Sequence, residues 1–184
     1  MRVISGQARG RRLKAPKGNT TRPTSDRVKE AIFNVLAFKL DGSRILDVFA
    51  GTGGLGIEAL SRGAQEAVFI EKNRAPWLIL KENLLSTGLS SKGRLILGDF
   101  AVVLPQLEGR FDIAFLDPPY NRGFIQPAVS LIIQSGLLDA QGVIVVETNA
   151  REKELPDPGV ISLVKESVYG DTAVLYYQFS EGVF

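Results

Sequence analysis

Short apolar runs alternate with amphipathic segments through most of the chain, and this alternation predicts its elements. The apolar runs predict strands at residues 44–49, 67–71, 95–98, 111–116 and 143–147. Helices are expected at residues 55–62, about 76–86 and 124–134, with a shorter helix that ends at residue 107. Because apolar side chains occupy both faces of these strands, both faces are expected to be covered. Such burial is typical of a doubly wound parallel α/β sheet.

The two ends of the chain depart from this alternation. Before the first strand, Thr24 or Ser25 can cap a helix. The expected buried face of this helix comprises Val28, Ala31, Ile32, Val35 and Leu36. At the other end, residues 160–168 and 172–179 read as strands separated by only three residues, so they must pair antiparallel. We therefore expect a Rossmann-like α/β sheet of about seven strands with an antiparallel C-terminal hairpin.

Histidine and cysteine are both absent from the 184 residues. Their absence removes disulfides, thiolate nucleophiles, the most common general base and the most common metal ligands. Any catalysis must therefore rely on carboxylates, backbone dipoles and positioning, and no metal is expected. The first residues lack the apolar core of a signal peptide, and no apolar run approaches the roughly 20 residues of a membrane span. We expect a cytoplasmic monomer without a membrane partner.

Positive charge is concentrated at the N-terminus. Residues 1–25 hold seven of the 22 basic residues and no acidic residue, which leaves 15 basic against 20 acidic residues for the rest. Apolar pairs, glycines and Pro16 within residues 1–23 predict a short extended arm or hairpin. A basic segment gains affinity for phosphate by releasing counterions, although many basic termini are only solvated tails. The chain thus divides into a basic arm (1–23) and one larger domain (24–184).

A glycine-rich turn follows the first predicted strand. Gly51, Gly53 and Gly56 satisfy the pattern G-x-G-x-x-G, and Glu71 lies twenty residues after Gly51, at the end of the next strand. Glycines at such a turn let the backbone approach a ligand closely, and the acid can accept hydrogen bonds from ribose hydroxyls. The pattern indicates a nucleoside-containing cofactor. By itself it fits a nicotinamide dinucleotide as well as S-adenosylmethionine.

A parallel sheet that ends in an antiparallel hairpin resembles the class I methyltransferases. This resemblance implies that Asp47, just before the glycine turn, lies near the amino acid end of the cofactor. It also implies that Asp99, at the end of the third parallel strand, accepts a hydrogen bond from the adenine amino group. With Glu71, three acids then follow three successive strands at the edge where open α/β sheets bind ligands. A pyrophosphate is disfavoured beside Asp47, so S-adenosylmethionine is the expected cofactor.

The sequence Asp117-Pro118-Pro119-Tyr120 directly follows the fourth parallel strand. The amine of a nucleobase is a poor nucleophile because its lone pair is delocalised into the ring, so the amine must be aimed. Asp117 and the Pro118 carbonyl can each accept one amine hydrogen, while the two prolines stiffen the loop and add no donor. Tyr120 offers a ring on which a base can stack, worth about 1 to 3 kcal/mol. These four residues are the predicted catalytic residues, but similar tetrads serve adenine N6, cytosine N4, guanine N2 and, with asparagine first, protein glutamine.

Further segments narrow the resemblance. Residues 22–34 (RPTSDRVKEAIFN) are similar to the opening signature of the RsmD family, the bacterial guanine N2-methyltransferases of 16S ribosomal RNA. Residues 4–13, 49–64 and 169–172 resemble that family's basic arm, glycine turn and last hairpin. Thr52 and Gly54 stand where serine and alanine are usual, and both are small. The likeness covers nearly the whole chain.

The resemblance implies methyl transfer from S-adenosylmethionine to the N2 amine of a guanine in 16S ribosomal RNA, within the small subunit or an assembly intermediate. The arm would bind RNA, and residues 24–184 would form the methyltransferase domain. The expected cofactor-binding residues are Asp47, Phe49, Gly51, Thr52, Gly53, Gly56, Glu71, Lys72, Asp99 and Phe100. The expected RNA-binding residues are Arg9, Arg11, Arg12, Lys14, Arg22 and Arg27.

Three alternatives stay open at this point. An N6-adenine methyltransferase of DNA or RNA is the nearest, although the chain is short for a dedicated sequence-reading domain. A nicotinamide-dependent oxidoreductase is favoured only by the glycine pattern. A catalytically inactive RNA-binding assembly factor is supported by the basic arm.

Overall fold

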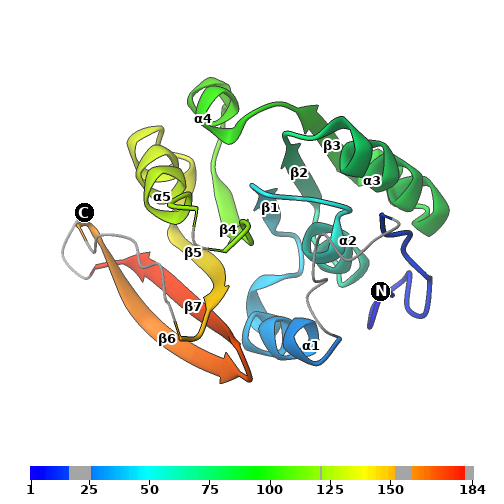
Figure 1. The fold of residues 1–184 in the computed structure, drawn as a ribbon, viewed down its shortest axis with the longest axis horizontal. Helices are drawn as coiled ribbons and strands as arrows, with labels where there is room; N and C mark the ends of the chain where they lie inside the picture. The colour runs from blue at the N-terminus through cyan, green and yellow to red at the C-terminus, as the bar shows by residue number, and fades with distance from the viewer. Residues whose placement is uncertain (17–25, 121, 152–158, 181–184) are drawn as a thin grey trace.

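Seven strands form one twisted sheet with helices on both faces (Figure 1). The protein is described by a computed structural model for residues 1–16, 26–120, 122–151 and 159–180. The strand order is β3-β2-β1-β4-β5-β7-β6. The predicted helix cap at residue 24 or 25 and the predicted RNA-binding residue Arg22 lie outside the described residues.

Five strands run parallel and two are antiparallel, as predicted. The parallel strands are β1 (Arg44–Asp47), β2 (Glu66–Glu71), β3 (Gly93–Leu97), β4 (Phe111–Leu116) and β5 (Leu138–Asn149). The antiparallel strands are β6 (Ile161–Tyr169) and β7 (Thr172–Phe179). Because β1 pairs with both β2 and β4, the strand order reverses direction between β1 and β4. Open α/β sheets bind ligands outside the carboxyl ends of the strands at such a switch point.

The helices divide between the two faces of the sheet (Figure 1). One face is covered by α1 (Asp26–Val35), α2 (Gly54–Ser61) and α3 (Arg74–Thr87). The other is covered by α4 (Phe100–Val103) and α5 (Ile125–Gln134). Three 3-10 turns, η1 (Ala37–Lys39), η2 (Ser90–Lys92) and η3 (Leu104–Gln106), connect the elements. Within the described ranges, no helix has the length and apolarity that a membrane crossing requires.

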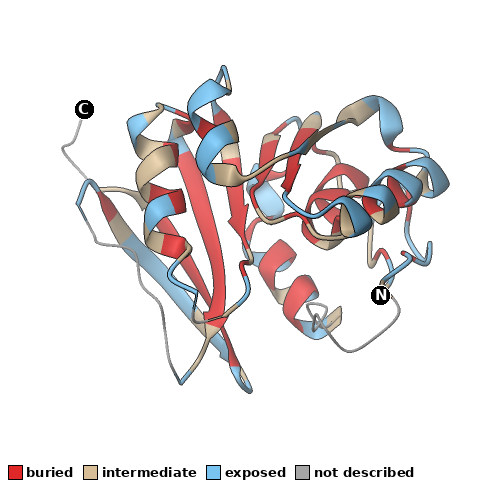
Figure 2. Cartoon of the chain, turned by 45° about the horizontal axis from the view of Figure 1, so that its top comes forward, coloured by how far each residue is buried: buried red, intermediate tan, exposed pale blue. Residues whose placement is uncertain are grey.

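Burial follows this layering, with the central strands enclosed and the outer helix surfaces exposed (Figure 2). β5 begins at Leu138, five residues earlier than predicted, because its polar first part pairs Leu138 with Phe111 across a register shift. The expected face of α1 is partly wrong. Val35 is 38% exposed, whereas Lys29 and Phe33 are fully buried. Because Lys29 is charged but buried near the middle of this face, the apolar periodicity of the sequence does not identify the buried face correctly.

The N-terminal residues form the expected hairpin, and it packs against α2. Val3 and Leu13 are buried in the core cluster that also holds α1, α2 and α3. The amides of Ile4 and Ser5 donate to the Glu58 carboxylate at 2.8 and 2.9 Å. The last residue of α2 also bonds to the hairpin, because Ser61 Oγ donates to the Ser5 carbonyl at 2.6 Å. The described part of the basic segment is therefore continuous with the core.

Two opposite charges are enclosed where the hairpin meets the helices. Lys29 Nζ lies 3.2 Å from Glu58 Oε2, and both side chains are 0% exposed. Lys29 also donates to the Arg2 carbonyl, so its ammonium links α1, α2 and the hairpin. Arg62 Nε donates to Glu58 Oε1 at 2.8 Å, and its guanidinium lies over the Phe33 ring at 4.9 Å. Glu58 thus accepts from two backbone amides and two cations.

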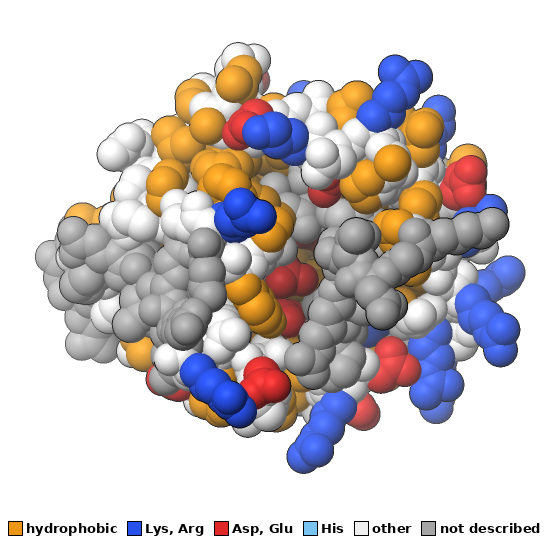
Figure 3. Space-filling view, viewed as in Figure 1, with side chains coloured by type: hydrophobic (Ala, Val, Ile, Leu, Met, Phe, Trp, Pro, Cys, Tyr) orange, Lys and Arg blue, Asp and Glu red, His pale blue; other side chains and the backbone are white. Residues whose placement is uncertain are grey.

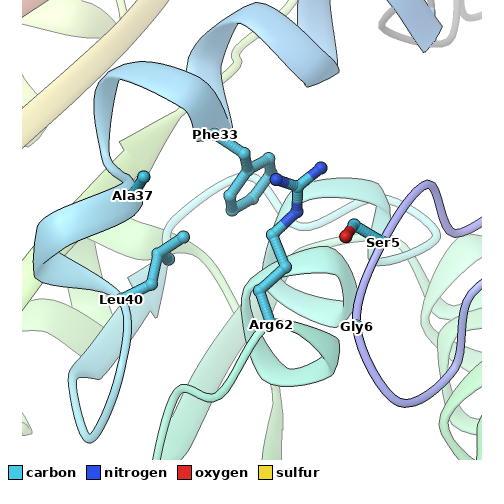
Figure 4. Close-up of a pocket in the computed structure, with 6 residues that line it drawn as sticks. All are labelled: Ser5, Gly6, Phe33, Ala37, Leu40 and Arg62. Atoms are coloured by element: carbon cyan, nitrogen blue, oxygen red, sulfur yellow. The ribbon is translucent and has the colours of Figure 1, made fainter.

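A cavity of about 250 Å³ opens beside this network, at the end of α2 away from the glycine turn (Figure 4). Its lining residues are Ser5, Gly6, Phe33, Ala37, Leu40 and Arg62. The Arg62 side chain extends between the hairpin and the Phe33 ring. Because α2 separates this cavity from the carboxyl ends of β1 and β4, it is not part of the site described below.

The Glu58→Gln substitution tests whether this network holds the hairpin. Removing one charge leaves Lys29 buried without its carboxylate, so the free energy of unfolding should fall by about 3 to 5 kcal/mol. Urea unfolding measures the change. Glu66→Gln is the control, because Glu66 pairs with Arg44 near the surface and should contribute less than about 1 kcal/mol. Equal small losses in both variants would contradict the assignment.

Candidate active site

The predicted catalytic loop begins where β4 ends, next to the glycine turn. Asp47 is paired with Phe115, so the two loops leave neighbouring strands at the same edge. Pro118 is buried, Pro119 is exposed, and Asp117 is half-buried. No cis peptide bond occurs among the described residues, so both proline bonds are trans. On the side of the molecule seen in Figure 3, acidic side chains lie in a hollow near the centre, and lysines and arginines lie mainly around the margin.

The glycine turn divides into a packed part and an open part. Gly53 is left-handed, with φ +87°, and precedes α2. A Cβ at Gly56 would lie 2.2 Å from Phe69 Cε1, so only glycine lets α2 approach β2 this closely. A Cβ at Gly51 would meet no atom within 4 Å. Of the three predicted glycines, Gly51 therefore borders open space that a ligand can enter.

Asp47 is buried at the base of this turn. Its exposed fraction is 2%, and its Oδ2 accepts a hydrogen bond from the Gly56 amide at 3.0 Å. The pKa of Asp47 is raised to about 7. Burial is the largest cause, the hydrogen bond from the Gly56 amide opposes it, and the nearby Glu71 charge adds to it. A cation bound beside Asp47 would favour its charged form. The site is therefore suited to a positively charged group.

Glu71 holds two loops at the end of β2. Its Oε2 accepts from the Gly51 amide at 2.9 Å, and its Oε1 accepts from the Asn73 amide at 2.6 Å. A carboxylate has about four acceptor positions, so each oxygen can also accept from a ligand hydroxyl. Glu71 is thus both a brace for the glycine turn and a potential ribose acceptor.

Asp99 lies at the end of β3 and is linked to the end of β2. Its side chain caps α4 by accepting from the Ala101 amide at 3.0 Å, and Lys72 Nζ lies 2.8 Å from its Oδ2. The bond from Lys72 and the Ala101 amide together lower the pKa of Asp99, so it is an ionised acceptor at neutral pH. The predicted residue Lys72 thus contacts a second predicted residue.

Three half-buried aromatic rings pack against one another, and two of them, Phe49 and Phe100, come closely after Asp47 and Asp99 in the sequence. The Phe49 ring lies 5.1 Å from the Phe100 ring and stacks at 6.1 Å on the Phe124 ring. The Phe100 and Phe124 centroids are 6.0 Å apart. Phe49 and Phe100 were expected from the sequence. Phe124, just before α5, was not, and its only sequence signal is an aromatic residue shortly after the proline pair.

Tyr120 reaches from the predicted catalytic loop to the antiparallel part of the sheet. Its hydroxyl lies 3.4 Å from Glu147 Oε1 and 3.4 Å from Thr172 Oγ1. Burial is the main cause that raises the pKa of Tyr120 to about 12, so the hydroxyl stays protonated. Glu147 and Thr172 were not among the expected site residues. Neither is easily recognised from the sequence as a site residue, because each lies within or at the start of an otherwise apolar strand.

The comparisons with known proteins agree with this geometry. The family model described as Conserved hypothetical protein 95, which represents the RsmD family, matches residues 1–178. Ribosomal RNA small subunit methyltransferase D of Escherichia coli strain K12 is 40% identical over 179 residues, covering 97% of this chain and 89% of the relative. The chain belongs to the RsmD family. A protein of the same name from Haemophilus influenzae is 37% identical over 181 residues, covering 97% and 93%.

Solved structures extend the likeness to the RsmD fold. A structure of the Escherichia coli protein yhhF, assigned as a methyltransferase, has a TM-score of 0.88, 39% identity and 98% coverage of both chains. The SAH-bound methyltransferase PaMTH1 of Podospora anserina has a TM-score of 0.69 at 20% identity, with 88% and 84% coverage, and supports the fold alone. The predicted class I methyltransferase fold is therefore confirmed.

The residues present fit the S-adenosylmethionine that RsmD relatives imply. The buried carboxylate of Asp47 suits a cationic amino acid end, Glu71 has acceptor capacity for ribose, and the aromatic trio offers apolar surface for a purine. Asp47 and Glu71 end the neighbouring strands β1 and β2, and Phe49 follows β1. In the described part of the chain, no cluster of three or more His, Cys, Asp or Glu side chains is placed to hold a metal.

The predicted RNA-binding residues are all exposed where the structure describes them. Arg9, Arg11 and Arg12 lie on the hairpin surface, and Arg27 lies on α1. Lys14 also pairs with Glu82 of α3 at 2.7 Å. Their contact with RNA stays a prediction.

The Asp47→Asn substitution tests the buried carboxyl. Because its folded pKa lies above the ordinary 3.8, the proton is lost more easily after unfolding. The free energy of unfolding of the unmodified chain should then fall by about 1 kcal/mol per pH unit between about pH 4 and 7 relative to the variant, and stay level above. Urea unfolding at several pH values measures the difference. A difference that does not change with pH would contradict the assignment.

Proposed function

We propose that this RsmD-family protein transfers a methyl group from S-adenosylmethionine to the exocyclic N2 amine of a guanine in 16S ribosomal RNA. The observation that carries the proposal is the position of the Asp117–Tyr120 loop. It leaves β4 beside β1, so its acceptors share one edge of the sheet with Asp47 and the glycine turn. The names of the relatives, which refer to ribosomal RNA of the small subunit, support the RNA class.

Asp47, Glu71 and Asp99 would hold the cofactor at its charged, ribose and adenine parts, with Phe49 and Phe100 beside the adenine. The other expected contacts come from the glycine turn and from Lys72, which is paired with Asp99. When bound, S-adenosylmethionine supplies a methyl group already activated by a positive sulfur. The protein therefore needs to position the amine rather than activate the methyl group.

The catalytic loop would do this positioning. Asp117 Oδ and the Pro118 carbonyl each accept one amine hydrogen, which directs the nitrogen lone pair toward the cofactor. The buried Pro118 and its fixed φ hold that carbonyl in place. Tyr120 stacks on the base, and its hydroxyl is anchored near Glu147 and Thr172. No histidine base is required for this arrangement.

The hairpin would contact the RNA backbone. Arg9, Arg11 and Arg12 are exposed on a hairpin that is fixed to α2, the helix that follows the glycine turn. Phosphates bound there would lie at a constant distance from the catalytic loop. A guanine in a loop of the RNA can be unstacked at modest cost and enter the site. The small subunit or an assembly intermediate is the proposed physiological substrate.

The Asp117→Ala substitution tests the catalytic role. Loss of one amine acceptor should lower the rate of methyl transfer by about 10² to 10⁴, while S-adenosylmethionine affinity changes little. The assay incubates labelled cofactor with under-methylated small subunits and digests the RNA to nucleosides, where label should appear as N2-methylguanosine. Asp41→Ala, an exposed change before β1, is the control. Full activity of Asp117→Ala, or label on another nucleoside, would contradict the proposal.

Neutralising the hairpin tests the RNA contact without damaging the core. Truncation would remove the buried Val3 and Leu13, so charge changes are preferable. The triple variant Arg9→Gln, Arg11→Gln and Arg12→Gln should bind small-subunit RNA more weakly. Its log-log salt slope should be reduced by roughly 0.7 for each single-strand phosphate that the variant leaves without a cationic partner.

Filter binding at several salt concentrations measures this slope. Lys165→Gln on β6, at the far edge of the sheet from β3, is the matched control for removal of an exposed cation. An unchanged slope in the triple variant would show that the hairpin does not contact phosphates.

A further inference from the structure

A buried carboxylate, Glu147, lies beside the proposed catalytic loop. Glu147, near the carboxyl end of β5, is 6% exposed. Val146 pairs with Leu116 of β4, so Glu147 comes directly after one of these paired residues and Asp117 directly after the other. Burying a carboxylate is unfavourable unless polar groups compensate for the lost water, and the Tyr120 hydroxyl is one such group.

Strand alternation places Glu147 on the same face of the sheet as Asp47. Phe115, Val145 and Val174 belong to the core cluster on the side of α1, α2 and α3. Side chains two residues apart in a strand share a face, so Glu147 and Thr172 point to this side. Ile45 belongs to the same cluster, so Asp47, two residues later on β1, also points to this side.

The described contacts connect Glu147 to the base-binding ring. Tyr120 donates its hydroxyl hydrogen toward Glu147 Oε1 at 3.4 Å, and Thr172 Oγ1 is equally distant from that hydroxyl. The carboxylate therefore lies at the rim of the ring on which the base would stack. A carboxylate has about four acceptor positions, so it can accept hydrogen bonds from several partners at once.

Guanine differs from the other amine-bearing bases at the ring atom next to the amine. In guanine the N2 amine is flanked by the N1–H donor and the N3 acceptor, so on its N1 side two donors stand next to each other. In adenine and cytosine, the ring nitrogen beside the amine is an acceptor. A carboxylate is an acceptor only, so it can accept a hydrogen bond from the N1–H of guanine. The ring nitrogen of adenine or cytosine would find no donor there, and its lone pair would be repelled by the carboxylate. Unpaired polar groups in a buried site are a strong basis for rejecting the wrong substrate.

We propose that Glu147 binds the ring N1–H of the target guanine, beside the amine held by Asp117 and Pro118, and thereby selects guanine over adenine and cytosine. This inference rests on the proposed function and adds the residue that reads the base. Asp117 would orient the amine, Tyr120 would stack on the base, and Glu147 would accept a hydrogen bond from the N1–H beside the amine.

The test uses the full-length protein and a substrate that isolates the N1–H. Small-subunit RNA is ligated so that the mapped target position carries guanosine, 2-aminopurine riboside or inosine, and is assembled with ribosomal proteins. 2-Aminopurine keeps the amine but has an acceptor at N1, whereas inosine has N1–H without the amine. The unmodified enzyme should methylate guanosine at least about a hundredfold faster than 2-aminopurine, and should not methylate inosine.

Glu147→Gln is the decisive variant, because its amide can donate to the N1 acceptor of 2-aminopurine. It should slow guanosine methylation and narrow the guanosine to 2-aminopurine ratio of kcat/KM by about tenfold or more. Loss of a purely structural carboxylate would lower both rates together and leave the ratio unchanged. An unchanged ratio would overturn the inference. The missing O6 of 2-aminopurine affects both enzymes equally.

Two further variants complete the design. Thr172→Val removes the other partner of the Tyr120 hydroxyl and keeps the carboxylate, so the ratio should stay at the unmodified value. Glu147→Asp keeps the charge and retracts it, so it should retain the preference for guanosine at a lower rate, even if the glutamine variant folds poorly. A narrowed ratio in Glu147→Asp would also overturn the inference.

The same experiment distinguishes this inference from the proposed function. Methylation of guanosine at N2 with an unchanged ratio in Glu147→Gln would reject only the role of Glu147. Methylation by the unmodified enzyme at an adenine or cytosine amine would reject both. Calorimetric binding of S-adenosylmethionine to each variant shows that the cofactor site is intact.

Discussion

The pairing of β1 with β4 is the contact on which the geometry of the candidate site depends. These strands are far apart in the sequence, yet Asp47 is paired with Phe115, so a glycine turn and a rigid acceptor loop leave the sheet side by side. Their carboxyl ends lie where the strand order reverses, and crossover connections leave a crevice there. Neither loop would suffice alone for the proposed reaction. In the proposal, one offers acceptors for an amine, and the other offers a site for a cationic nucleoside.

Buried charge fixes this arrangement at both ends of α2. At the start of the helix, Asp47 accepts from the Gly56 amide, and Glu71 holds the turn through Gly51. Near its last turn, Glu58 gathers Lys29 and the hairpin amides. One helix therefore joins the glycine turn to the basic hairpin. Enclosed polar contacts hold the positive surface of the hairpin against this helix.

Much of this could be predicted from the sequence, because strand ends and glycine turns carry local signals. The four residues Asp117–Tyr120 follow the fourth parallel strand as expected, and the strand pairing confirms that it lies beside the first. Longer-range features had no such signal. Lys29 reads as a surface cation because its partner Glu58 is 29 residues away. Glu147 reads as the polar end of an apolar strand, since only sheet register brings it to Tyr120.

We propose that this crevice directs a sulfur-borne methyl group at an amine held by residues 117–120. A crystal structure of the protein with bound S-adenosylmethionine would reveal the direction of that group. We expect the adenosine to lie between Glu71 and Asp99, and the transferable carbon to point into the space bounded by Asp117, the Pro118 carbonyl and the Tyr120 ring. A cofactor bound elsewhere, or bound here with that carbon directed away from residues 117–120, would show that the proposed site is wrong.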